Sequence, residues 1–129
     1  MTNGETGLWR WVELPRFARF CRAICEETGI PYEGEFDVVR SAIEDNILRR
    51  PFSVSHPDPR FNPTDEDRRV FKTDAAPGRT KVPPLVVVIR VAEYPTFGHP
   101  GVIEGREVWS LTELQRIGLS LETPGDSVV

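Results

Sequence analysis

A chain of 129 residues, 39% hydrophobic and 28% charged, has the length of one domain with a modest core. Its formal net charge of −4 argues against a protein that simply coats nucleic acid, because such binding depends on neutralising phosphates. No apolar run approaches the roughly 18 residues that cross a membrane, and the first residues lack the pattern of a signal peptide. We therefore expect an intracellular, cytoplasmic protein with no membrane partner.

The N-terminal part of the chain predicts a strand followed by a helix. Residues 8–12 are rich in β-forming side chains, which indicates a short strand or an extended arm over residues 1–12. Pro15 suits the first turn of a helix, and Gly29 suits its end. Between them apolar side chains recur at helical spacing along one face, namely Leu14, Phe17, Ala18, Cys21, Ile24 and Cys25.

A second amphipathic helix is expected from about Glu35 to Arg50. Its apolar stripe consists of Phe36, Val39, Ile43 and Ile47, with Ala42 and Leu48 widening the apolar surface. Acidic residues gather at its start and arginines at its end, which complements the helix dipole. We expect the two helices to pack side by side on a sheet or as a helical hairpin.

The segment 51–84 is punctuated by proline and is predicted to be a long, irregular loop. Within it, Arg69–Lys72 alone resembles a strand. Loops of this length are uncommon in compact domains and tend to be functional loops, arms that wrap a partner or disordered segments.

The C-terminal half supplies the expected sheet. Residues 85–91 form an apolar run rich in valine and isoleucine, which predicts a central strand buried on both faces. Residues 102–103 and 107–109 are expected to be two short strands around a turn at 104–106. Ser110 and Glu113 have the spacing of a capping box, which predicts a short helix near 110–118 with Leu114 and Ile117 facing inward.

Together these elements predict a single α+β domain over residues 1–129. Its two N-terminal helices pack on a small mixed or antiparallel sheet with central strand 85–91, and residues 122–129 form a loose tail.

Cys21 and Cys25 lie four residues apart and share a helix face. Two thiolates so placed could supply half of a zinc site, with His56 and His99 completing it. Both cysteines also lie on the apolar stripe, where a reduced cysteine behaves as a small hydrophobic side chain. We expect core packing, and therefore neither a metal nor another cofactor.

A catalytic function would depend on few residues of this chain. Glu93, His99 and Arg106 are the residue types that a small metal-independent nuclease or toxin-like hydrolase uses as base, acid and phosphate clamp. Strand alternation, however, places Arg90 and Tyr94 on one face and Glu93 on the other. No Gly-rich phosphate loop, nucleophile elbow or HExxH pattern is present. Catalysis is thus the less favoured alternative.

The basic helix face formed by Arg16, Arg19 and Arg22, with Trp9 and Trp11 nearby, is the remaining surface candidate. Arginine interleaved with tryptophan can anchor a protein interface or stack on bases. A solvated helix face with both tryptophans in the core explains the same pattern. We expect a non-enzymatic interaction or assembly subunit, such as one from a virus or mobile element, that binds a protein partner or a second copy. Regulatory nucleic-acid binding is the less favoured alternative.

Overall fold

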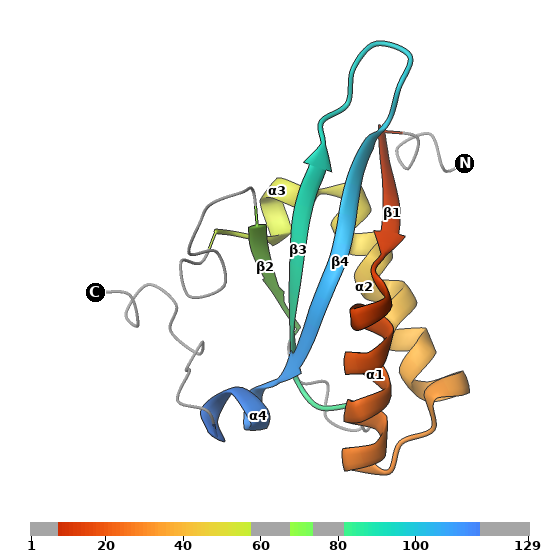
Figure 1. Ribbon diagram of the computed structural model, residues 1–129, viewed down its shortest axis with the longest axis vertical. Coiled ribbons are helices and arrows are strands. Elements are labelled where there is room, and N and C mark those ends of the chain that lie inside the picture. The colour runs from red at the N-terminus through yellow and green to blue at the C-terminus, as the bar shows by residue number, and fades with distance from the viewer. Residues whose placement is uncertain (1–7, 58–67, 74–81, 117–129) are drawn as a thin grey trace.

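The computed structural model describes residues 8–57, 68–73 and 82–116 and has an α+β fold (Figure 1). Its four-stranded mixed sheet has the order β1-β4-β3-β2. Strand β1 pairs parallel with β4, whereas β4–β3 and β3–β2 are antiparallel. The strands are β1 (Trp9–Glu13), β2 (Arg68–Lys72), β3 (Leu85–Glu93) and β4 (Gly101–Ser110). The predicted fold class is confirmed, with β3 in the interior of the sheet.

The helices divide between the two faces of this sheet. They are α1 (Pro15–Thr28), α2 (Asp37–Arg49), α3 (Pro51–Val54) and α4 (Leu111–Arg116). The sheet is turned toward the viewer in Figure 1, with α2 and α3 behind it and α1 continuing from the end of β1. We call the side of the sheet that faces α1 and α2 the helix face and the other side the open face.

Helix α1 begins and ends where the sequence predicts. Pro15 occupies the first turn, and Gly29 closes the helix with a φ of 75°, a left-handed conformation that glycine tolerates best. Phe17, Cys21 and Ile24 on its apolar stripe are buried. Core packing of the cysteines is therefore confirmed.

Helix α2 follows a kinked turn at Tyr32–Phe36, in which Gly34 has a φ of 95°. Its predicted stripe is buried at Phe36, Ile43 and Ile47, whereas Ala42 is exposed, contrary to expectation. Arg40 ties this helix to β1, because its guanidinium pairs with Glu13 as well as with Asp37 and Glu44.

Strand β3 separates two apolar clusters because alternate side chains point to opposite faces. Toward the helix face, Leu85, Val87, Ile89 and Val91 join the main core with the stripes of α1 and α2. Toward the open face, a smaller cluster contains Val70, Val86, Val88 and Leu114. Leu114 is fully buried, so α4 covers this end of the open face as the capping-box pattern predicts. Ile117, Gly118 and the tail 122–129 lie outside the described residues.

The prediction of two short strands around a turn at 104–106 was wrong. Strand β4 runs without interruption and carries a bulge at Arg106, where the register steps from Val88↔Glu107 to Ile89↔Gly105. A glycine in an apolar segment suggests a turn, but Gly105 instead allows a close approach. A Cβ atom there would lie 2.6 Å from Trp11 Cζ2 and 2.9 Å from Phe17 Cδ2.

The Pro-rich segment contains more structure than expected. The predicted strand at 69–72 is present as β2, while the single-turn helix α3 was not predicted. Residues 58–67 and 74–81 lie outside the described residues.

Candidate interaction site at the end of the sheet

The turn that joins β3 to β4 is closed by paired backbone hydrogen bonds. The Thr96 amide donates to the His99 carbonyl at 3.0 Å, and the His99 amide donates to the Thr96 carbonyl at 2.9 Å. Gly98 adopts a φ of 84°, which side-chain-bearing residues rarely adopt. Pro95 and Pro100 flank the turn and have no amide proton for further pairing. The result is a defined hairpin tip beyond the sheet (Figure 1).

Phe97 occupies this tip and is fully exposed. Burying a phenylalanine side chain stabilises a protein by roughly 2–3 kcal/mol. Folding of this chain does not gain that stabilisation, because the Phe97 ring stays in contact with solvent. The closed turn also restricts the backbone that carries the ring. Little conformational entropy would therefore be lost if a partner enclosed it.

An aromatic cluster lies at the base of the hairpin. Tyr94 and Phe52 stack with ring centroids 6.1 Å apart, and both pack edge-on against the buried Trp9. The guanidinium of Arg69 lies 5.0 Å from the centre of the Phe52 ring. Tyr94 and Phe52 are each about half exposed. The cluster therefore has a buried base on Trp9 and an outer surface of two rings.

Leu8, the residue before β1, brings a further apolar side chain to the same end. The register Trp9↔Gly101 fixes the start of β1 beside the start of β4, directly below the hairpin tip. Among the described residues, five large hydrophobic side chains are exposed: Leu8, Val38, Phe52, Tyr94 and Phe97. All but Val38 lie at this end, and we call these four the apical patch.

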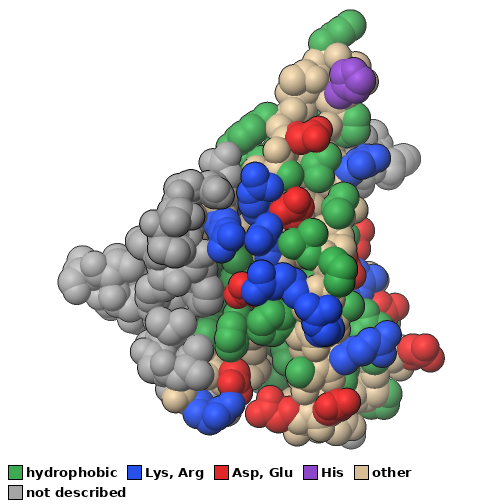
Figure 2. Space-filling model, viewed as in Figure 1, with side chains coloured by type: hydrophobic (Ala, Val, Ile, Leu, Met, Phe, Trp, Pro, Cys, Tyr) green, Lys and Arg blue, Asp and Glu red, His purple; other side chains and the backbone are tan. Residues whose placement is uncertain are grey.

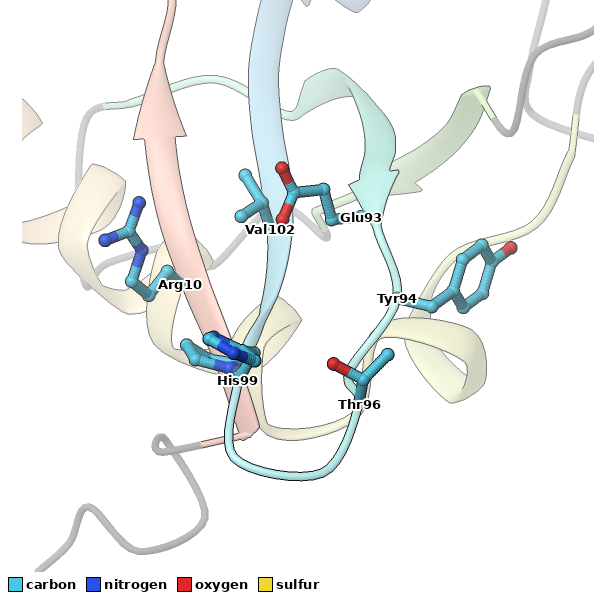
Figure 3. Close-up of a pocket in the computed structure, with 7 residues that line it drawn as sticks. Arg10, Glu93, Tyr94, Thr96, His99 and Val102 are labelled. Carbon is cyan, nitrogen blue, oxygen red and sulfur yellow. The ribbon is translucent and has the colours of Figure 1, made fainter.

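On the open side of the hairpin lies a hollow of about 520 Å³. Figure 3 shows Arg10 from β1, Glu93 from the end of β3 and His99 from the turn around it. Two of the three residues proposed for catalysis, Glu93 and His99, are thus brought together. Arg106 does not line this hollow, where Arg10 supplies the guanidinium instead.

The face assignment made from strict alternation was wrong. The register steps from Val91↔Ile103 to Glu93↔Val102, so Ala92 is an extra residue in β3. This bulge places Glu93 on the open face with Arg90, while Tyr94 turns toward Trp9 on the helix face. Glu93, His99 and Arg10 are all exposed, and no hydrogen bond joins any two of these described side chains.

The structure does not bring the predicted tryptophan and arginine residues together on one surface. Trp9 is buried, and Trp11 packs against Phe17 with its indole nitrogen donating to Glu13 at 3.1 Å. Both rings therefore face inward, away from the arginines. On α1 the arginines point to different neighbours: Arg16 pairs with Glu107, Arg22 lies over the Tyr32 ring at 5.0 Å, and Arg19 is exposed.

The cysteines lie apart from this site. Burial raises the pKa of the Cys21 thiol to about 12, so it is neutral at physiological pH. Within the described ranges, no group of three or more His, Cys, Asp or Glu side chains could hold a metal ion. None of the helices described is long and apolar enough to cross a membrane.

Sequence reasoning did not select Phe97, Phe52 or Tyr94 as interaction residues. An aromatic residue followed by glycine between two prolines, as in Pro95-Thr96-Phe97-Gly98-His99-Pro100, is a usable signal for an exposed ring on a turn. Phe52 could not be found in this way, because its exposure depends on how α3 packs against Trp9.

Comparison with known proteins identifies no relative. No family model, no curated protein and no solved structure matches this chain. Any function assigned to it therefore rests on the geometry of its own residues.

Proposed function

We propose that this protein is a non-enzymatic binding module that docks on a protein partner through the apical patch. The observation that carries the proposal is the gathering of Leu8, Phe52, Tyr94 and Phe97 at one end of the sheet. Single exposed hydrophobic residues are normal, whereas several of them at one end of a domain favour an interaction site there. Aromatic rings are also the side chains that most often dominate binding energy.

The partner that fits this surface is a folded protein with an apolar pocket. Phe97 is the projecting anchor, and the half-exposed pair Phe52 and Tyr94 forms the flatter contact around it. Arg10, Glu93 and His99 lie beside the patch and supply a polar rim. An apolar centre with a polar rim is the usual anatomy of a protein interface.

Site-specific photocrosslinking tests this proposal. A photoreactive phenylalanine analogue is placed at position 97 of the full chain and, as the matched control, at Val38, which is exposed on α2. We expect one discrete protein from the native source to crosslink at position 97 and not at position 38. Equal products at both positions, or no product at position 97, would contradict the proposal.

A small metal-independent hydrolase is the second candidate, because the hollow brings Glu93 and His99 together with Arg10. In this alternative Glu93 is the base, His99 the acid and Arg10 the phosphate clamp. Cleavage of RNA or DNA that falls at least 100-fold in both His99→Ala and Arg10→Gln would favour it. A cleavage rate unchanged by His99→Ala would exclude it.

A further inference from the structure

The charges on α1 are arranged against the dipole of this helix. Arg16 lies in its first turn, and Glu26 and Glu27 lie in its last turn. No acidic residue lies in the first turn and no basic residue in the last. A helix is stabilised by the opposite arrangement, because its N-terminus carries partial positive charge and its C-terminus partial negative charge. The stability of the single helix therefore does not explain where these charges lie.

Four side chains form a stripe along α1, which we call the α1 stripe: Arg16, Phe20, Ala23 and Glu27. Their spacing of four, three and four residues places them on one side of the helix. Arg16, Ala23 and Glu27 are exposed, and Phe20 is partly buried. The stripe is distinct from the buried residues of α1, which pack into the main core.

The middle of the α1 stripe borders an apolar groove. Phe20 and Ala23 line a hollow of about 210 Å³ whose other wall includes Val108 and Trp109 on β4. The Phe20 ring packs against Trp109, with the ring centroids 5.1 Å apart. A shallow hollow of about 450 Å³ continues from the same two residues of α1 toward its arginines. An apolar side chain placed over Ala23 would therefore enter a preformed recess.

Arginines lie at the start of this groove. Arg16 and Arg19 line the shallow hollow together with Phe20 and Ala23. Arg16 donates to Glu107 from one nitrogen at 3.2 Å, and Arg19 is exposed and forms no ion pair with another described residue. Two guanidiniums thus accompany one carboxylate at this end.

Carboxylates lie at the other end of the groove. Glu27 and Glu113 line the hollow there, and Glu26 is exposed beside them on α1. Arg116 pairs with Glu113 and is also close enough to Glu27 to feel its charge. Three carboxylates therefore accompany one guanidinium. Figure 2, which has the view of Figure 1, shows blue side chains toward the start of α1 and red ones toward its end and beside α4.

A second copy of α1 in antiparallel orientation complements this stripe. If Arg16 of one copy lies opposite Glu27 of the other, Phe20 lies opposite Ala23 in the same alignment. Both matches occur twice, because a two-fold axis makes each contact reciprocal. A large ring then meets a small side chain, which is how side chains of one helix fit between those of another.

The same alignment explains the charges at the helix ends. Alongside the α1 stripe, Arg19 of one copy lies opposite Glu26 of the other. The arginines of each copy then lie at the C-terminal end of the other helix, where the dipole favours cations, and the glutamates lie at its N-terminal end. Charges that oppose the dipole of their own helix thus complement the helix of the second copy.

We propose that this protein forms a two-fold symmetric homodimer through antiparallel packing of the α1 stripe. From Arg16 to Glu27 the stripe extends about 16 Å, or about three helical turns. A contact of this length is at the small end of protein interfaces, so the dimer is reversible with micromolar affinity. The α1 stripe contains no residue of the apical patch, so either proposal can fail without the other.

Sedimentation velocity on the full chain, between about 1 and 200 µM, tests the proposal. We expect Arg19→Glu and Glu26→Arg each to weaken dimerisation at least 10-fold, because each places like charges opposite one another twice. An equimolar mixture of these two variants should form heterodimers with nearly wild-type affinity, because both contacts then join opposite charges. The matched control is Arg49→Glu on α2, which changes the net charge as Arg19→Glu does but replaces an arginine that pairs with Asp45. It should dimerise like the wild type.

Ala23→Asp tests the apolar centre of the contact. Ala23 is exposed, so the variant should keep the circular dichroism spectrum of the wild type while sedimenting as a monomer. Phe97→Ala should leave dimerisation unchanged. A wild-type monomer at about 200 µM, equal dissociation constants for Arg19→Glu and Arg49→Glu, or no heterodimer in the mixture would each overturn the proposal. A dimer that persists in Ala23→Asp and dissociates in Phe97→Ala would overturn it and assign self-association to the apical patch.

Discussion

Replacing Gly105 by alanine tests how α1 packs on β4. An added Cβ atom would lie 2.6 Å from Trp11 Cζ2 and 2.9 Å from Phe17 Cδ2, well inside ordinary contact distances. Neither ring can withdraw easily, because Phe17 is buried in the main core and the Trp11 indole is hydrogen-bonded to Glu13. The two rings also pack edge-to-face, with centroids 5.7 Å apart.

The expected cost is that of overpacking a well-filled core. Inserting one methyl group in such a place destabilises by about 1–3 kcal/mol. In a domain of this size, each kcal/mol lowers the Tm by about 4 °C. We therefore expect Gly105→Ala to lower the Tm by about 4–12 °C without changing the secondary structure.

Thermal and urea unfolding followed by circular dichroism measure this effect, and a double-mutant cycle assigns its cause. Phe17→Leu opens space beside the new methyl group, so the loss in Gly105→Ala/Phe17→Leu should be smaller than the sum of the two single losses. A Gly105→Ala free energy of unfolding within about 0.5 kcal/mol of the wild type would refute the packing derived for β4.

Two further predictions concern the core. Leu114→Ala should lower the free energy of unfolding by about 3 kcal/mol in urea titrations, because Leu114 is fully buried over Val70, Val86 and Val88; a loss below about 1 kcal/mol would show that α4 does not cover the open face. The Cys21 thiol, whose pKa burial raises to about 12, should resist iodoacetamide at pH 8 in the native protein and react readily in denaturant. Because this pKa lies above that of an unfolded cysteine, the free energy of unfolding should fall as the pH rises beyond about 9, and Cys21→Ala should reduce that fall. Rapid labelling of the native protein, or the same dependence of stability on pH in Cys21→Ala as in the wild type, would contradict a buried, neutral Cys21 thiol.

The helices could be predicted because their determinants are local. Pro15 and Gly29 specify the ends of α1, and the apolar spacing specifies its buried face. The continuous apolar run 85–91 predicts a strand buried on both sides, and the structure has β3 there with clusters on each face. In each case the residues that decide the element lie within it.

The bulges could not be predicted, because they depend on pairing between distant segments. Whether Gly105 bends the chain or admits an aromatic ring is decided by Trp11 and Phe17, far away in the sequence. The extra residue at Ala92 moves Glu93 to the other face and so changes the composition of the candidate site. A single-residue step reverses every later side chain in a strand, and strict alternation cannot anticipate it.

The surface was the least predictable part. Trp9 and Trp11 were candidates for an interface, yet their rings fill the space above Gly101 and Gly105 in the core. The residues of the apical patch instead come from the segment before β1, from α3 and from the β3–β4 hairpin. Their proximity arises from the parallel pairing of β1 with β4, a contact between the two ends of the described fold.

The affinity of the partner captured at position 97 for two alanine variants tests the central claim most directly. Titration calorimetry should give at least 30-fold weaker binding for Phe97→Ala, the loss expected of a central aromatic anchor. Val38→Ala should bind within 2-fold of the wild type, and both variants should unfold like the wild type because both side chains are exposed. Equal affinities for the two variants would contradict docking through the apical patch.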